Sequence, residues 1–253
     1  MTILPYIDRL LDLTREAGLA ILRVYESPLS EWNLESKGDS SPLTLADRLS
    51  HDVIEKGLTK LTPHIPIMSE EGSAIPFNVR KHWDSYWCVD PLDGTKEFIS
   101  KNGEFTVNIA LIVHNKPVFG IIYVPVKDIL YYGGKDIGSF KIAGMEKIRI
   151  FTDQQPAEFI AVGSKSHAVK EESDFLNALH VKSIVQVGSS LKFCMVAEGK
   201  AHIYYRHGPT MEWDTAAGHA IALASGASMS GINGDAFIYN KPNLLNPGFI
   251  CRS

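Results

Sequence analysis

Residues 87–95 read Trp87-Cys88-Val89-Asp90-Pro91-Leu92-Asp93-Gly94-Thr95. The apolar run before Asp90 predicts a short buried strand, and the Asp-Pro and Asp-Gly pairs predict a turn that ends it. Asp90 and Asp93 would then lie at a strand end, where carboxylate oxygens suit a hard divalent cation. Because Asp, Pro and Gly are also the commonest turn formers, an ordinary strand-to-loop connection explains this stretch alone equally well. Other acidic residues must decide between the two interpretations.

Composition indicates an ordinary globular protein. The chain has 253 residues, of which 45% are hydrophobic and 21% charged, so it can form one large domain or two closely packed halves. Its net charge of -4 gives no general attraction to polyanions, so nucleic-acid binding through a basic surface is disfavoured. Cys88, Cys194 and Cys251 form no Cys-x-x-Cys pair, which argues against a disulfide framework or a zinc site and favours a reducing compartment.

Neither a signal peptide nor a transmembrane segment is expected. Asp8, Asp12 and Glu16 interrupt the first apolar residues, and no apolar run is long enough to cross a bilayer. We therefore expect a cytoplasmic protein, either a monomer or a homodimer. Loose attachment to the cytoplasmic face of the inner membrane stays open.

The first half of the chain begins with two predicted helices. Apolar residues at three- and four-residue intervals predict a helix that starts after Thr2 and fades near Ser27. A polar loop at residues 36–43 leads to a second helix, which Thr44 caps. Asp47 stands three residues after Thr44, as in a capping box, so its simplest role is to satisfy the helix start.

Runs of β-branched residues then predict strands. Residues 106–114 and 118–124 predict an antiparallel hairpin with its turn at Asn115-Lys116-Pro117, and residues 131–134 and 147–151 extend it. From Phe159 onward, strands and helices alternate. The expected elements are residues 159–162, 171–179, 183–187, 191–198, 201–205 and 214–225, with a closing strand near Phe249. The pattern predicts an α/β (α+β) protein with two halves, residues 1–155 and 156–253, packed tightly as one unit.

Acidic residues recur at the ends of these predicted elements. They are Asp39, Glu70, Glu71, Asp90, Asp93 and Asp214. Each lies beside an apolar segment with a glycine or proline nearby, so we expect the carboxylates to converge at one edge of the sheets. Gathered like charges repel one another, and a bound cation is the usual remedy. Oxygen donors favour magnesium or manganese over zinc or copper.

Three motifs follow one another along the chain, namely Glu70-Glu71, Asp90-Pro91-Leu92-Asp93-Gly94-Thr95 and Glu212-Trp213-Asp214-Thr215-Ala216-Ala217-Gly218. Their order and spacing resemble the signature of the inositol monophosphatase superfamily of magnesium-dependent, lithium-sensitive phosphatases. The resemblance covers essentially the whole chain and implies a layered α-β-α-β-α sandwich. Residues 37–47, 163–167 and 188–193 are most similar to the 3'(2'),5'-bisphosphate nucleotidases of the bacterial CysQ type.

The resemblance implies a site with two or three Mg²⁺ ions, with Mn²⁺ as the alternative and Li⁺ as an inhibitor. Glu70, Asp90 and the Leu92 carbonyl would hold one ion. Asp90, Asp93 and Asp214 would hold a second, so Asp90 would bridge the two. Glu71 is expected beside these ligands rather than among them.

The resemblance also implies which groups act on the substrate. The amides of Gly94 and Thr95 would receive the scissile phosphate, which also contacts the residues that hold the metal. The Thr95 hydroxyl would orient the attacking water with the help of an acid from the first loop. Asp39 matches the nucleotidase pattern and Asp47 the inositol-phosphatase pattern, and we prefer Asp39.

Substrate choice depends on weaker signals in the second half. The candidate substrate-binding residues are Ser164, His167, Ser189, Lys192 and Arg206. Each has an ordinary structural explanation as a cap, a loop residue or an exposed helix residue. A basic cluster on an acidic protein would suit the second phosphate of a bisphosphorylated nucleotide. Tyr204, Tyr205 and Trp213 would either stack on an adenine or belong to the core.

Three functions remain open from the sequence. The leading hypothesis is removal of the 3'-phosphate of adenosine 3',5'-bisphosphate, and of its sulfated form, in sulfur assimilation, which the resemblance implies. An inositol monophosphatase or fructose-1,6-bisphosphatase is the alternative enzyme. A non-catalytic nucleotide or metal sensor is the alternative of another class, although a sensor has no need for the Thr95 hydroxyl.

Overall fold

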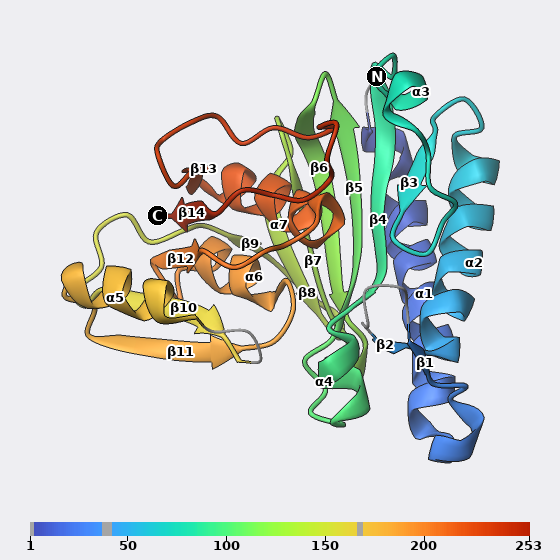
Figure 1. Ribbon diagram of the computed structural model, residues 1–253, viewed down its shortest axis with the longest axis horizontal. Coiled ribbons are helices and arrows are strands. Elements are labelled where there is room, and N and C mark those ends of the chain that lie inside the picture. The colour runs from blue at the N-terminus through green and yellow to red at the C-terminus, as the bar shows by residue number, and fades with distance from the viewer. Residues whose placement is uncertain (1–2, 37–41, 166–168) are drawn as a thin grey trace.

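Helical layers and sheets alternate across the molecule (Figure 1). The computed structural model describes residues 3–36, 42–165 and 169–253. Within these ranges, the strands form a seven-stranded sheet (the large sheet), a five-stranded sheet (the small sheet) and a two-stranded ladder. The helices are α1 (Ile7–Glu26), α2 (Leu45–Leu61), α3 (Phe77–Arg80), α4 (Thr95–Ile99), α5 (Lys170–Ala178), α6 (Leu191–Ala197) and α7 (Glu212–Ser225).

The large sheet has the order β3-β4-β5-β6-β7-β8-β9, with β3 parallel to β4 and the other neighbours antiparallel. Its strands are β3 (Ile67–Ser69), β4 (Ser85–Asp93), β5 (Thr106–Val113), β6 (Lys116–Val124), β7 (Ile129–Gly134), β8 (Gly138–Ala143) and β9 (Glu146–Ile150). The small sheet has the order β11-β10-β12-β14-β13. Its strands are β10 (Ile160–Ser164), β11 (Ser183–Val187), β12 (Ile203–Arg206), β13 (Ser228–Gly231) and β14 (Phe249–Arg252). The ladder pairs β1 (Glu35–Ser36) with β2 (Pro42–Leu43).

Three apolar clusters hold these layers together. The first fills the space between α1, α2 and the large sheet. The second lies between the other face of the large sheet, α6, α7 and the small sheet, and the third lies between the small sheet and α5. Figure 1 shows the same order of layers from α1 and α2 on one side to α5 on the other. The predicted α-β-α-β-α sandwich is confirmed.

Both predicted helices of the first half are present. The chain enters α1 through a 3-10 turn at Leu4–Tyr6, and α1 ends at Glu26 before Ser27. At the start of α2, the Thr44 hydroxyl accepts a hydrogen bond from the Ala46 amide. The Asp47 carboxylate accepts one from the Thr44 amide at 2.8 Å. The predicted capping box is confirmed.

The structure corrects several predicted boundaries. The hairpin turn consists of His114 and Asn115, which both have positive φ angles (47° and 62°), so Pro117 belongs to β6 rather than to the turn. Strands β8 and β13 were not predicted, and α7 begins at Glu212 instead of Asp214. The strand before Asp90 does not stop there, because β4 continues to Asp93.

Helix α7 belongs to the second half of the chain but packs directly on the large sheet. Two glycines of that sheet allow this close approach. A Cβ atom at Gly120 would lie 2.3 Å from the Ala217 carbonyl oxygen, and one at Gly133 would lie 3.2 Å from the Ile221 Cα. This close packing holds α7 next to β4, the strand that carries the acidic motif. The division of the chain into residues 1–155 and 156–253 stays a prediction.

Burial of His219 on α7 makes the stability of the protein depend on pH. The side chain is 4% exposed, and its Nδ1 atom lies 3.0 Å from the Tyr239 hydroxyl. Burial lowers the pKa of His219 from 6.5 to about 3. Near pH 5 the unfolded chain therefore binds a proton that the folded chain does not. The contribution of this group to stability is complete above pH 6.5 and is lost as the pH falls toward 3.

Lowering the pH from 7 to 4 should reduce the unfolding free energy of the wild type, in part because the unfolded chain protonates His219. We expect this reduction to be about 3 kcal/mol smaller in His219→Gln. Urea unfolding at the two pH values measures this difference. His180→Gln removes an exposed histidine and should follow the wild type. Equal losses in His219→Gln and the wild type would rule out His219 as the source.

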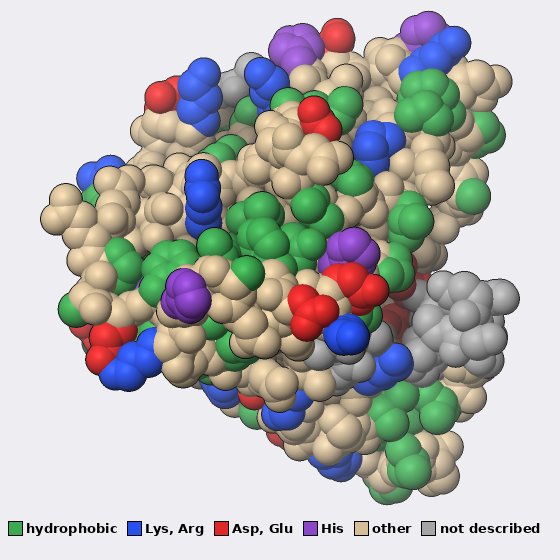
Figure 2. Space-filling view, turned by 60° about the vertical axis from the view of Figure 1, so that its left-hand side comes forward, with side chains coloured by type: hydrophobic (Ala, Val, Ile, Leu, Met, Phe, Trp, Pro, Cys, Tyr) green, Lys and Arg blue, Asp and Glu red, His purple; other side chains and the backbone are tan. Residues whose placement is uncertain are grey.

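On the face that Figure 2 shows, basic side chains form no single continuous patch. Among the residues drawn in colour in Figure 2, Lys and Arg side chains lie singly between acidic, histidine and hydrophobic ones. This distribution agrees with the net charge of -4. No helix within the described ranges has the length and apolar character that a membrane crossing requires.

Candidate active site

One cavity of about 270 Å³ brings together predicted site residues from both halves of the chain. Those that line it are Glu70, Asp90, Leu92, Asp93, Gly94, Thr95, Ser164, Ser189, Lys192, Arg206 and Asp214. Asp39 and His167 lie outside the described residues, so their predicted roles are not tested by the structure. The sequence motifs thus converge on one place, although they are spread over more than half of the chain.

An irregularity in β4 places its two aspartates on the same cavity. The pairing register with β5 shifts between Asp90 and Asp93, where Pro91 has no amide to donate. In a regular strand, residues three apart point to opposite faces. The shift removes this alternation, and the Leu92 amide donates to Asp90 Oδ1 at 3.0 Å. Gly94 then ends the strand with φ 91°, a left-handed conformation that glycine adopts without strain.

Asp93 is oriented by a backbone amide from a distant segment, and Asp214 by the amide at the start of its own helix. The Ser190 amide donates to Asp93 Oδ2 at 2.6 Å, and the Met211 amide donates to Asp214 Oδ2 at 2.8 Å. Each carboxylate therefore commits one oxygen to the protein, and both side chains line the cavity. Charge-assisted bonds of this kind fix the rotation of a carboxylate.

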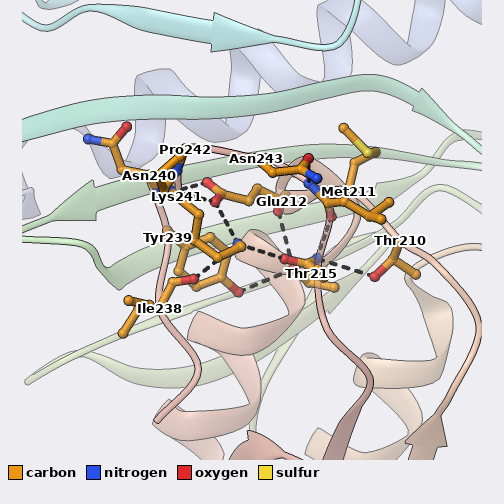
Figure 3. Close-up of polar contacts among 12 residues, drawn as sticks. Thr210, Met211, Glu212, Thr215, Ile238, Tyr239, Asn240, Lys241, Pro242 and Asn243 are labelled. Carbon is orange, nitrogen blue, oxygen red and sulfur yellow. Dashed lines mark hydrogen bonds and ion pairs between the residues drawn. The ribbon is translucent and has the colours of Figure 1, made fainter. Parts of the chain in front are cut away.

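The start of α7, which carries Asp214, is braced by Glu212. The Glu212 carboxylate accepts hydrogen bonds from the Asn240 amide at 2.7 Å and from the Lys241 amide at 3.0 Å. It also pairs with Lys241 Nζ at 2.6 Å. Figure 3 shows this carboxylate between Tyr239, Asn240 and Lys241 at the helix end. Because Glu212 is fully buried, it is a structural anchor and is not exposed to the cavity.

Burial and mutual repulsion raise the pKa values of the cavity carboxylates. The pKa of Asp90 is raised well above its usual range by burial, then by the charges of Glu70, Asp93 and Asp214. Burial and the charges of Asp93 and Glu70 raise the pKa of Asp214 in the same way. For Asp93, burial raises the pKa to about 6, although Lys192 opposes the shift. Without a counter-charge these groups resist ionisation together.

These donors fit a hard divalent cation. They are carboxylate oxygens and one carbonyl at the end of a strand, and a cation would relieve the repulsion that raises their pKa values. Within residues 3–36, 42–165 and 169–253, no group of three or more acidic, histidine or cysteine side chains is already arranged to hold a metal ion. The fit therefore rests on the chemistry of the donors.

Thr95 stands between the cavity and Asp47. Its hydroxyl lies 3.5 Å from Asp47 Oδ1, while Asp47 Oδ2 accepts from the Thr44 hydroxyl at 2.6 Å. Asp47 thus uses one oxygen to cap α2 and directs the other toward Thr95. Within the described residues, this contact makes Asp47 a candidate partner of Thr95. The role of Asp39 stays a prediction.

Basic side chains line the same cavity. Burial lowers the pKa of Lys192 to about 8, and its ammonium donates to the carbonyls of Ser189 at 2.6 Å and Val187 at 3.3 Å. Arg206 pairs at 3.4 Å with Glu172, which is buried beneath it. Tyr204 lines the cavity, whereas Tyr205 stacks on Phe175 with ring centroids 4.0 Å apart and Trp213 packs against the second apolar cluster.

The sequence model of the inositol monophosphatase family matches residues 5–251. The chain belongs to the inositol monophosphatase family. Among relatives, the 3'(2'),5'-bisphosphate nucleotidase CysQ of Escherichia coli (strain K12) is 46% identical over 244 residues, which cover 96% of this chain and 98% of that protein. The protein of the same name from Haemophilus influenzae is 32% identical over 250 residues, covering 96% and 91%.

Solved structures of family members agree with this assignment. The crystal structure of CysQ from Bacteroides thetaiotaomicron has a TM-score of 0.86 and 44% identity, and the match covers 96% of this chain and 94% of that one. The extragenic suppressor protein suhB from Bartonella henselae has a TM-score of 0.80 at 23% identity, with 98% and 94% covered, and shows the shared fold.

Several residues that line the cavity of this family member were not predicted. They are Lys96, Glu97, Ser190, Phe193, Pro209, Thr210 and Thr215. Most of them adjoin a predicted site residue in the sequence, and this adjacency is the signal that could have indicated them. Thr106 and Asn108 behind the cavity were also missed, although polar side chains in the apolar run of β5 could have indicated them.

Proposed function

We propose that this protein is a Mg²⁺-dependent phosphatase that removes the 3'-phosphate of adenosine 3',5'-bisphosphate, giving AMP and phosphate. The sulfated counterpart of this nucleotide is proposed as a second substrate. The observation that carries the proposal is one cavity lined both by the carboxylates of Asp90, Asp93 and Asp214 and by the basic side chains of Lys192 and Arg206. The nucleotidases named above, with up to 98% of their length matched, support it. We also propose a cytoplasmic location, which suits the three free, buried cysteines.

The carboxylates that line the cavity would hold the cations. Glu70, Asp90 and the Leu92 carbonyl are proposed for one Mg²⁺, and Asp90, Asp93 and Asp214 for a second. When bound, such ions supply Lewis-acid stabilisation of the charge on phosphate and lower the pKa of a nearby water. Burial and neighbouring carboxylates raise the pKa values of Asp90 and Asp214, and the positive charge of a bound cation would oppose this rise.

The residues of the chain itself would orient the water and the phosphate. Thr95 Oγ1, 3.5 Å from Asp47 Oδ1, can accept a hydrogen bond from the attacking water while it donates its own proton toward Asp47. The Gly94 and Thr95 amides at the end of β4 are proposed to hold the scissile phosphate. In-line attack needs this orientation more than any covalent step by the protein.

The basic side chains in the cavity would favour a bisphosphate over a monophosphate. Arg206 lines the cavity, and its guanidinium is held by Glu172, which also accepts from the His207 amide at 3.1 Å. A second phosphate placed here meets a planar, oriented donor group. Inositol 1-phosphate has no second phosphate to place there.

Phosphate release from three substrates tests the proposal. Adenosine 3',5'-bisphosphate, inositol 1-phosphate and fructose 1,6-bisphosphate are each incubated with the protein and Mg²⁺, with and without Li⁺. We expect the nucleotide to have the highest kcat/KM and Li⁺ to inhibit its hydrolysis. A preference for either sugar phosphate would exclude the nucleotidase function, and no release from any substrate would favour a sensor.

Substitution of Arg206 should change substrate preference. We expect Arg206→Met to lower kcat/KM for adenosine 3',5'-bisphosphate by about 100-fold, because a charge-assisted contact to the second phosphate contributes about 2–3 kcal/mol. Activity toward inositol 1-phosphate should change much less. Arg206→Lys keeps the charge beside buried Glu172 and serves as the folding control. Equal losses on both substrates would contradict a role for Arg206 in selectivity.

A further inference from the structure

Two buried polar residues of β5, Thr106 and Asn108, lie behind Asp93 and do not line the cavity. Their exposed fractions are 0% and 1%, and the rest of the strand is apolar. The proposed mechanism gives neither residue a role. Burial of a polar side chain without hydrogen bonds costs folding free energy. The hydrogen-bond partners of these two residues therefore indicate what role they have.

Both residues connect Asp93 with Ser190. Asn108 Nδ2 donates to Asp93 Oδ2 at 3.3 Å, and Asn108 Oδ1 accepts from the Ser190 hydroxyl at 2.8 Å. The Thr106 hydroxyl lies 2.8 Å from the Ser190 hydroxyl and 3.5 Å from Asp93 Oδ2. The Ser190 amide closes the arrangement with its bond of 2.6 Å to the same oxygen of Asp93. We call these four residues the Asp93 network.

The network determines the orientation of two parts of the cavity. On the acidic side, two donors, the Ser190 amide and Asn108 Nδ2, converge on Asp93 Oδ2, so the carboxylate cannot rotate without breaking both bonds. On the other side, the network holds Ser190, whose neighbour Ser189 has a positive φ of 46° and lines the cavity. The Ser189 hydroxyl is buried and, in the described part of the chain, has no hydrogen-bond partner. A displaced Ser190 would therefore move a cavity-lining residue as well.

We propose that Asn108 and Thr106 are positioning residues that orient Asp93 for a divalent cation and connect it to residues 188–190 across the cavity. This inference rests on the proposed role of Asp93 as a cation ligand. Residues that hydrogen-bond a metal ligand typically change metal affinity by 10- to 100-fold when they are replaced. The same bonds make the acidic motif of β4 and the loop before α6 one structural unit.

Isothermal titration of Mg²⁺ into the substrate-free protein tests the first part. We expect Asn108→Ala to raise the dissociation constant at least ~10-fold over the wild type. Thr106→Val removes a hydroxyl at constant shape and should raise it in the same direction, whereas Thr106→Ser keeps the hydroxyl and should restore the wild-type value. An unchanged dissociation constant in Asn108→Ala and Thr106→Val would overturn the proposal.

A matched control separates positioning from simple loss of stability. Thr62→Val removes another buried hydroxyl at constant shape, and that hydroxyl bonds Leu58 and Trp87 rather than a cavity residue. It should lower the melting temperature and leave Mg²⁺ affinity unchanged. If Thr62→Val weakened Mg²⁺ binding as much as Asn108→Ala does, a general loss of stability would explain the effect, and the proposal would be contradicted.

Hydrogen exchange tests the connection across the cavity. Amides of residues 187–193 should exchange faster in Asn108→Ala than in the wild type, since Ser190 loses an acceptor. Asn108→Ala and Ser190→Ala break the same link, so their effects on Mg²⁺ affinity should be less than additive. Additive effects, or unchanged exchange, would disprove the connection. Absence of phosphate release by the wild type would instead refute the proposed function and leave these binding results intact.

Discussion

Asp90→Asn is expected to remain folded and to lose phosphatase activity by a factor on the order of 10³ or more. Asp90 is proposed to contact both cations, so the amide removes a ligand from each. The substitution keeps the shape of the side chain and can retain the bond to the Leu92 amide. Because Asp90 is buried beside other carboxylates that raise its pKa, removal of its charge should leave the metal-free melting temperature equal to or above that of the wild type.

Two measurements check this result. Phosphate release with saturating Mg²⁺ gives the activity, and thermal unfolding with and without Mg²⁺ gives the stability. Mg²⁺ should raise the melting temperature of the wild type and have a much smaller effect on Asp90→Asn, since a ligand stabilises only the state that binds it. Asp84→Asn, an exposed position just before β4, should behave as the wild type. Near-normal Mg²⁺-dependent activity in Asp90→Asn would show that the metal site is assigned to the wrong residues.

Thr95→Val should lower kcat by about 100-fold or more and leave KM nearly unchanged. Valine has the shape of threonine but no hydroxyl to orient water, while the backbone amide proposed to hold the phosphate is retained. Thr95→Ser keeps the hydroxyl and should recover most of the activity. Steady-state kinetics of the two variants measure the effect, and full activity of Thr95→Val would exclude the hydroxyl from the reaction.

A double-mutant cycle decides which acid assists Thr95. If Asp47 acts through the 3.5 Å contact with the Thr95 hydroxyl, Asp47→Asn should have little further effect in a Thr95→Val background. The same cycle with Asp39→Asn tests the acid that matches the nucleotidase pattern. The acid whose effect is additive with that of Thr95→Val does not act through the hydroxyl.

Most elements could be predicted because their patterns are local. The apolar spacing of α1 and the Thr44 capping box of α2 depend on residues within one or two turns. Strand β8 was missed because its residues Gly138–Ala143 are mostly half-buried and mixed in polarity. The extension of β4 through Asp-Pro was missed because only pairing with β5 shows that the strand continues past a turn-like sequence.

The candidate site also contains some residues that the sequence indicates and others that only the fold reveals. The acidic motifs could be found because the order of Glu70, Asp90, Asp93 and Asp214 is visible in the chain. The link from Asp93 to Ser190 spans 97 residues and depends on how α6 meets the large sheet. The anchoring of Glu212 by Asn240 and Lys241 likewise depends on the fold, and the residue had no predicted role beyond its motif.

The sequence alone determined the kinds of chemical groups and the layered fold. Residue type fixes which atoms can hold a cation or a phosphate, and local periodicity fixes where helices and strands form. Only the tertiary structure decided which side chains face one cavity, that Asp47 contacts Thr95, and that Thr106 and Asn108 lie behind Asp93. These facts depend on strand register and on packing between distant segments, which no local pattern records.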